Sequence, residues 1–347
     1  MSQPWIRSAR YDGLFILAPP FVALAVVGLL PPAYRATAQM PLLAWVALVV
    51  LIDVAHVYST LFRTYLDPLR RRQRWLLFWL VPAGCYGVGV ALYLGGGALL
   101  FWRVLAYLAV FHFIRQQYGF LRLYARHEPR GRGQWLDTVV IYYATIYPLL
   151  YWHFSPPRNF NWFIEGDFVQ HDWAAGRYLA TGLYAAVLLL YAGKEARQWW
   201  RTRAFNWPRN LLVAGTLVSW FFGIVYFNGD LAFTLLNVMS HGIPYLALVW
   251  SSGPQHQPNG RLARRGAWRG RYGLLVFLGL VAVLAYVEEG FWDGLVWREH
   301  AAAFGAFQHL PRVADATWLA VLVPLLALPQ ATHYVLDGFI WRRRKPN

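Results

Sequence analysis

The sequence predicts an all-α fold, a polytopic transmembrane helical bundle of about ten spans that forms a single integral-membrane domain over residues 1–347. Three observations predict it. Apolar residues make up 58% of the chain and charged residues only 14%, which excludes an ordinary soluble domain. Apolar blocks long enough to cross roughly 30 Å of hydrocarbon recur along the whole chain. The basic residues gather between these blocks.

The ends of each expected span lie where an apolar block meets a basic cluster or a turn sequence. The first block runs from Gly13 to Leu30 without a small-residue cleavage pattern after it, so we expect a span rather than a signal peptide. Turn residues separate two closely spaced pairs of later blocks, at 95–97 and at 228–230. The later spans are expected over residues 41–63, 75–95, 98–122, 135–154, 174–193, 210–228, 229–251, 272–288 and 315–341.

Basic residues mark every second connection, which orients a membrane chain because short cytoplasmic loops are enriched in Lys and Arg. The basic segments are 7–10, 70–74, 122–132, 194–209, 261–271 and 342–345. The connections poor in basic residues are 31–40, 95–97, 155–173, 228–230 and 289–314. Both termini are therefore expected in the cytoplasm. This orientation, with attraction to anionic lipid, accounts for the net charge of +16, so no nucleic-acid partner is expected.

The chain has a single cysteine, Cys85. One thiol excludes an internal disulfide framework and a zinc or iron–sulfur site built from cysteines. Any bound metal must therefore use histidine, carboxylate or carbonyl ligands.

The ten histidines fall into two groups. Six lie in connections or near span ends, and no chemistry is assigned to them: His127, His153, His171, His256, His300 and His309. Four lie inside apolar spans, where an ionisable group is costly and usually faces a partner or a cavity: His56, His112, His241 and His333. In the expected topology their four helices run in the same direction. The four imidazoles then share one level, on the order of 20 Å below the outer surface, and can converge on one centre.

Each of these four histidines has polar companions about one helical turn away, a spacing that puts side chains on one face. The companions are Asp53, Gln116, Asn237, Tyr245 and Asp337. A metal-bound imidazole commonly gives its second N–H to a carboxylate or carbonyl, so Asp53 and Asp337 are expected in that outer role or as direct ligands. Asp337 is the better candidate for direct ligation, because it lies four residues after His333.

The types of ligand available limit which metal ions fit the site. Neutral imidazoles with one or two carboxylates suit iron, copper or zinc better than magnesium or calcium, and imidazole-rich sites with an open position are typical of non-haem Fe(II) oxygen chemistry. The sequence lacks the His-x-x-His-His cluster of membrane desaturases. Two histidines on facing helices are also compatible with haem b.

The order and setting of the histidines resemble those of the bacterial and archaeal Brp/Blh-like membrane β-carotene 15,15′-dioxygenases. The matching motifs are His56 in a polar patch of an early helix, Phe111-His112-Phe113, His241 before an aromatic-rich stretch, and the closing Thr332-His333-Tyr334 with Asp337. The resemblance implies an all-helical membrane enzyme with histidine-ligated Fe(II) that splits a conjugated polyene with O₂. Two positions depart from the family pattern: Val57 follows His56 where the family has His-Gly, and Tyr245 replaces a histidine.

The sequence thus favours a membrane-embedded, histidine-ligated non-haem iron oxygenase. It is expected to act with O₂ on a lipophilic, carotenoid-like or lipid-like substrate that enters from the bilayer, in a bacterial cytoplasmic membrane. Two alternatives remain open: a haem- or quinone-linked membrane redox protein, and a transporter or lipid-binding protein whose histidines relay protons.

Overall fold

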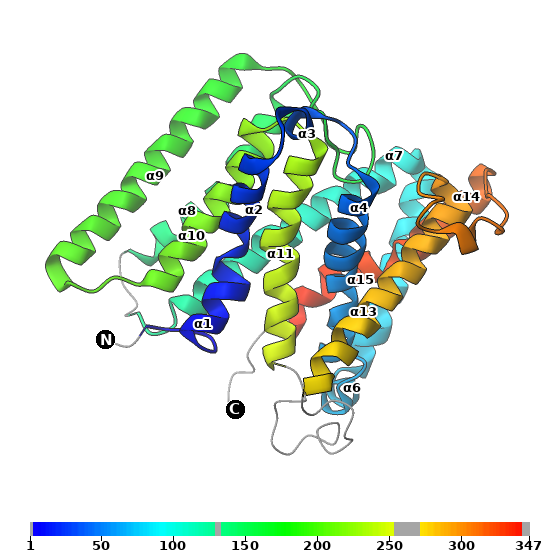
Figure 1. The fold of residues 1–347 in the computed structure, drawn as a ribbon, viewed down its shortest axis with the longest axis horizontal. Helices are drawn as coiled ribbons and strands as arrows, with labels where there is room; N and C mark the ends of the chain where they lie inside the picture. Colours follow the sequence, from blue (N-terminus) through cyan, green and yellow to red (C-terminus); the bar gives the residue numbers. More distant parts are fainter. Residues whose placement is uncertain (1–2, 129–132, 253–270, 342–347) are drawn as a thin grey trace. The chain divides into compact units, whose positions relative to one another are not determined.

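The computed structural model describes residues 3–128, 133–252 and 271–341, and every regular element in these ranges is helical (Figure 1). His256 and the basic segments over 261–270 and 342–345 lie outside the described residues. Six helices are long and apolar enough to cross a membrane, or up to eight if each of two bent pairs is one span. The all-helical fold with several candidate spans is thereby confirmed, whereas the count of ten spans stays a prediction.

The chain divides into two compact units, each made of two separate stretches of sequence. Unit 1 comprises Met1–Met40 and Phe113–Pro244, and unit 2 comprises Pro41–His112 and Tyr245–Asn347. The divisions fall inside two helices, α7 (Trp75–Tyr124) and α11 (Asp230–Ser252).

Unit 1 contains the first helices of the chain and most of its middle. Besides its parts of α7 and α11, its elements are α1 (Ala9–Asp12), η1 (Gly13–Leu17), α2 (Pro19–Leu29), α3 (Pro32–Ala36), α8 (Gln134–His153), α9 (Ala174–Thr202), α10 (Trp207–Trp220) and η4 (Phe221–Tyr226). Helix α10 packs against α2 and α8, and α8 packs against α9. The first expected span is bent by 48° between η1 and α2, where Pro19 and Pro20 interrupt the helical hydrogen bonds.

Unit 2 contains the second expected span and the end of the chain. Besides its parts of α7 and α11, its elements are α4 (Leu42–Trp45), η2 (Val46–Val54), α5 (Ala55–Ser59), η3 (Thr60–Arg63), α6 (Pro68–Gln73), α13 (Arg271–Trp292), η7 (Asp293–Trp297), η8 (Gly305–Phe307), α14 (Ala316–Leu326) and α15 (Leu328–Ile340). Helix α13 packs against η2 and α5, and α15 packs against α5 and α14. The pair α14 and α15 is bent by 43° just before Pro329.

Helix α7 runs over 50 residues, but its backbone leaves the helical region at Gly97. Gly97 has φ 77° and ψ −179°, a conformation that only glycine adopts without strain. The break falls in the turn expected at 95–97, between the spans 75–95 and 98–122. A helix of this length without a break would be roughly 75 Å long, more than twice the hydrocarbon thickness.

The segment 41–63 is less regular than its apolar sequence predicts. It passes from the α-helix α4 through the π-helix η2 and the α-helix α5 to the 3₁₀-helix η3. Residue pairs across the junction of η2 and α5 therefore do not follow ideal α-helical spacing. Stretches of π-helix within helices are frequent at functional sites, and here one ends just before His56.

Unit 1 also holds a buried cluster of ion pairs around Arg209, whose side chain is 0% exposed. The Arg209 guanidinium donates to Glu128 at 2.6 Å, to Asp137 at 3.4 Å and to Glu195. Lys194 pairs with Asp137 and lies 2.9 Å from Glu195. Two residues of the basic segment 194–209 are thus bound to carboxylates, and the pairs connect α8, α9 and α10.

Candidate metal centre

The four histidines predicted from the sequence form one buried group. His56, His112, His241 and His333 each offer a ring nitrogen, and these four nitrogens lie within 4.8 Å of one another. No more than 2% of any of these residues is exposed. The expected convergence of the histidines is confirmed, and the group could hold a metal ion.

His112 lies on α7 and His333 on α15, both in unit 2, and their rings approach each other through their Nε2 atoms. Nε2 of His333 lies 3.1 Å from Nε2 of His112. The His56 ring lies 5.0 Å from the His333 ring, centroid to centroid. Two nitrogens bound to one ion at about 2.0–2.1 Å are separated by roughly 2.8–3.4 Å when the angle at the metal is near 90–110°. The observed separation matches two neighbouring ligands of one ion.

Nδ1 of each of these three histidines lies near a side-chain oxygen, and in His112 and His333 it is the nitrogen opposite the facing Nε2. The pairs are His333 with Thr60 Oγ1 at 2.6 Å, His112 with Asp337 Oδ2 at 3.5 Å and His56 with Asp53 Oδ1 at 3.6 Å. A proton on Nδ1 that points toward an oxygen leaves the lone pair of Nε2 for a metal. This is how metal-bound imidazoles are usually oriented and made more basic.

A chain of hydrogen bonds connects the outer partners of His333 and His112. Thr60 Oγ1 lies 3.2 Å from the hydroxyl of Tyr245, which donates to Asp337 Oδ1 at 2.8 Å. The indole of Trp341 donates to the same Asp337 oxygen at 2.5 Å. With His333 as the first donor, each group in this chain can donate to the next, and all donors end on the Asp337 carboxylate.

This arrangement changes the role expected for Asp337. Its four-residue spacing predicts a pairing with His333, but its carboxylate lies beside Nδ1 of His112 and accepts from Tyr245 and Trp341. Asp337 is also not a member of the metal-binding group, so its geometry favours the outer role over direct ligation. Tyr245 lies in the outer chain as the sequence suggests.

His241 lies in unit 1, where Phe113 and Gln116 surround it. Its ring stacks on the Phe113 ring at a centroid distance of 3.5 Å and an interplanar angle of 10°. The backbone carbonyl of His241 accepts from the Gln116 amide at 3.0 Å. Gln116 therefore fixes the backbone at His241, and this bond departs from the expected pairing of its amide with the His112 ring.

Asn237, expected as a companion of His241, bonds within its own helix. Its amide donates to the Phe233 carbonyl one turn earlier, at 2.9 Å. Short polar side chains in helices often bond back to the i−4 carbonyl, which removes the need for a distant partner. This bond gives no support to a role for Asn237 in orienting His241.

Sequence reasoning missed Thr60 and Trp341. Both follow a predicted site residue by four positions, Thr60 after His56 and Trp341 after Asp337. The spacing places Trp341 on the helix face of Asp337, but it would have paired Thr60 with His56, whereas Thr60 contacts His333 of another helix. A hydroxyl and an indole N–H are equally able to complete the hydrogen bonds of a buried imidazole and carboxylate.

The described histidines outside the group have ordinary surroundings. His127, His171 and His309 are exposed, and His153 bonds the Leu149 carbonyl at 2.7 Å. His300 stacks on Trp45 at 3.8 Å, and burial lowers the pKa of His300 below its ordinary value. None of these five residues belongs to the metal-binding group.

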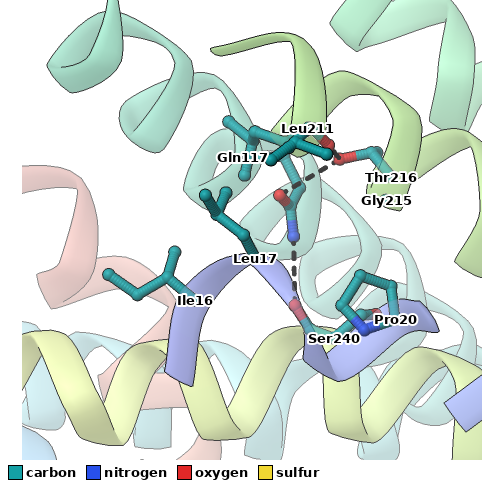
Figure 2. Close-up of a pocket in the computed structure, with 9 residues that line it drawn as sticks. Ile16, Leu17, Pro20, Gln117, Leu211, Gly215, Thr216 and Ser240 are labelled. Atoms are coloured by element: carbon teal, nitrogen blue, oxygen red, sulfur yellow. Dashed lines mark hydrogen bonds between the residues drawn. The ribbon is translucent and has the colours of Figure 1, made fainter. Parts of the chain in front are cut away.

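A small pocket in unit 1 lies close to Gln117, with about 10 Å³ of space for the centres of water-sized molecules. Figure 2 shows the Gln117 amide between Thr216 and Ser240. It donates to the Ser240 carbonyl at 3.3 Å and accepts from Thr216 at 3.2 Å. Because the Gln117 amide is engaged and about 10 Å³ is room for no more than about one water molecule, this pocket is a packing gap rather than a substrate site.

Comparison of the chain with protein-family models, with curated proteins and with solved structures finds no match. The functional argument therefore depends on the geometry of the histidine group.

Proposed function

We propose that this protein is a membrane-embedded oxygenase in which His56, His112, His241 and His333 hold one iron(II) ion, and that it acts with O₂ on a lipophilic substrate of the carotenoid or lipid type. The observation that carries the proposal is the 3.1 Å approach of the Nε2 atoms of His112 and His333, with an oxygen atom at Nδ1 of each ring. Two imidazoles that donate outward present two lone pairs to each other, and a cation between them removes the repulsion.

The same distance favours a single ion over haem. Axial imidazoles on either side of a haem iron are about 4 Å apart, twice a metal–nitrogen distance of about 2 Å, and the porphyrin passes between them. The 3.1 Å between Nε2 of His112 and Nε2 of His333 is shorter than this, so these two imidazoles suit one ion better than the two faces of a haem. Imidazole ligands without a thiolate suit iron in oxygen chemistry, with copper and zinc as the other fitting ions.

The residues of the chain orient the ligands and keep water away. Thr60, Tyr245 and Asp337 hold two imidazoles in the tautomer that leaves Nε2 for the metal. Tyr245 is 1% exposed, so this outer chain is dry and its hydrogen bonds are strong. The metal would supply a place for O₂ beside the substrate.

The reaction we propose is the cleavage of one carbon–carbon double bond by O₂. The double bond breaks, each carbon receives one oxygen atom, and two carbonyl groups result. Both atoms of O₂ are consumed, so the step needs no added electrons or protons. The resemblance of the histidine pattern to the Brp/Blh-like dioxygenases supports this choice over hydroxylation, which requires a reductant.

Metal analysis with an absorption spectrum of the detergent-purified chain tests the function. We expect one iron per chain, no Soret band, and O₂ consumption with a conjugated polyene that yields two carbonyl products. A Soret band would indicate the haem-linked alternative. A chain without any bound transition metal would support the transporter with a histidine proton relay and would refute the enzyme.

We further propose ten spans with both termini in the cytoplasm of a bacterial cell. This orientation rests on the alternation of basic segments. Reporter fusions near residues 96, 165 and 300 should lie outside, and fusions near 128, 200 and 262 should lie in the cytoplasm. Inverted results at two or more positions would refute the orientation.

A further inference from the structure

The rings of His241 on α11 and Phe113 on α7, both in unit 1, form a face-to-face pair. Their centroids are 3.5 Å apart and their planes differ by 10°. Carbon atoms in van der Waals contact are about 3.5–4.0 Å apart, so a centroid distance this short leaves almost no sideways offset between the rings. The pair is therefore a direct sandwich.

A direct sandwich is an unfavourable arrangement for two neutral aromatic rings, because both rings are negative on their faces. Neutral rings prefer an offset stack or an edge-to-face contact, with centroids about 4.5–7 Å apart. Phe160 and Phe233, also in unit 1, are parallel to the same 10°, but their centroids are 4.4 Å apart, which allows an offset. The pair of His241 and Phe113 thus departs from the geometry of neutral rings.

The tryptophan contacts of Phe113 follow that geometry. Trp162 meets the Phe113 ring at 5.1 Å and 78°, and Trp220 meets it at 6.3 Å and 86°, both edge to face. Phe113 is 5% exposed and Trp220 is 1% exposed, so the phenyl ring is packed inside unit 1. Its neighbours hold it in place against His241.

A positive charge on the imidazole removes the conflict in the sandwich. His241 offers one of the four ring nitrogens that lie within 4.8 Å of one another. An imidazole bound to a divalent cation takes up part of its positive charge, and the face of an aromatic ring attracts positive charge. This attraction is strongest where water is excluded, and His241 is 0% exposed. The sandwich is therefore favourable when His241 holds a metal.

We infer that Phe113 is a positioning residue for His241, whose ring it orients and stabilises in the metal-bound form; this inference rests on the proposed metal centre. Phe113 has no ligand atom, so it acts through His241. Oxygen atoms at Nδ1 orient His56, His112 and His333, and the phenyl ring has the corresponding part at His241.

Titration of the full chain in detergent with Co²⁺ tests this role. Phe113 is replaced by phenylalanine that carries one, two or three ring fluorines, which draw electron density from the ring face and change its shape little. We expect the affinity for Co²⁺ to fall step by step with each fluorine. Phe113→Leu, which removes the ring, should lower the affinity by about 2- to 30-fold, the range of one cation–π contact.

The matched control is the same fluorinated series at Phe160, which is 3% exposed and stacks on a phenyl ring instead of an imidazole. This series should bind Co²⁺ as the wild type does. In a chain that carries His241→Ala, fluorines at Phe113 should have no further effect, because the two residues act as one unit.

Equal Co²⁺ affinity across the fluorinated Phe113 series would overturn the inference and leave the metal centre standing, even if Phe113→Leu binds more weakly through lost packing. A fluorine effect of the same size in the His241→Ala chain would also overturn it. Wild-type protein that binds no Co²⁺ would overturn the metal centre and the role of Phe113 together. If Phe113→Leu fails to fold, the fluorinated series decides, since it keeps the shape of the ring.

Discussion

The ion-pair cluster around Arg209 and the histidine group are both buried and polar, but they differ in which atoms are in contact. Around Arg209, cations meet anions: the guanidinium contacts three carboxylates, and Lys194 contacts two of them. In the histidine group, like atoms meet, with two Nε2 atoms 3.1 Å apart.

This difference separates a structural cluster from a binding site. A cluster of opposite charges satisfies itself and fixes helices without a further component. The two facing Nε2 atoms carry no opposite charges, and with both protons on Nδ1, as in the proposed metal centre, their lone pairs suit a bound cation. The comparison predicts that substitutions in the histidine group change metal content first, whereas substitutions around Arg209 change the free energy of unfolding first.

The largest effect is expected for the loss of a ligand. His112→Ala or His333→Ala removes one of the facing Nε2 atoms, and metal affinity should fall by more than about 100-fold, the upper range for loss of an outer partner. Equilibrium dialysis against Fe²⁺ or Co²⁺ measures it. His171→Ala, at an exposed histidine, is the control and should bind metal as the wild type does. Full occupancy in both core variants would refute the shared site.

Arg209→Ala should act on stability instead. It removes the cation that Glu128, Asp137 and Glu195 share, so that Lys194 is left beside Asp137 and Glu195 and the amides of Asn206 and Asn210 are left beside Glu128 and Glu195. Loss of one member of a buried ion pair costs about 3–5 kcal/mol. Unfolding of the detergent-solubilised chain measures the loss, with the exposed Arg201→Ala as the control. The fraction that remains folded should bind metal with wild-type affinity. Weaker binding by that fraction would mean that the two clusters are not independent.

The sequence was sufficient to predict the helical membrane fold and the four histidines, because both follow from local signals. Apolar blocks define helices, and a histidine within such a block is rare enough to be informative. The break at Gly97 was also predictable, since three consecutive glycines permit a conformation that other residues avoid.

The outer partners were harder to predict, because they depend on packing between helices. A four-residue spacing states which side chains share a face, but Asp337 lies beside His112 of another helix, and Gln116 bonds the His241 backbone. The π-helix over Val46–Val54 has no sequence signal that we can identify, since its residues are ordinary apolar ones. Register between helices, rather than within them, decides these contacts.

Asp337→Asn should have an intermediate effect on the histidine group. The substitution keeps a side chain of similar shape that can still accept from Tyr245 and Trp341, but it removes the charge beside Nδ1 of His112. Loss of such an outer partner typically lowers metal affinity or activity by about 10- to 100-fold. Excess iron should restore occupancy. If excess iron fails to do so, Asp337 is itself a ligand. Asp172→Asn, at an exposed carboxylate, is the control.

The smallest effect is expected for Asp53→Asn. This variant tests whether the outer partners of the histidines contribute unequally to metal affinity. The 3.6 Å separation from His56 is longer than a hydrogen bond, and within the described residues no further side chain lies at hydrogen-bond distance from the Asp53 carboxylate. Asp337, at 9% exposure, is linked to two further donors that fix its carboxylate. We therefore expect Asp53→Asn to lower equilibrium metal affinity by about 10-fold or less, the lower end of the range for outer partners. Titration of both variants with Co²⁺ under identical conditions compares them directly. A larger loss for Asp53→Asn than for Asp337→Asn would reverse the order and make His56, rather than His112, the imidazole most dependent on its carboxylate.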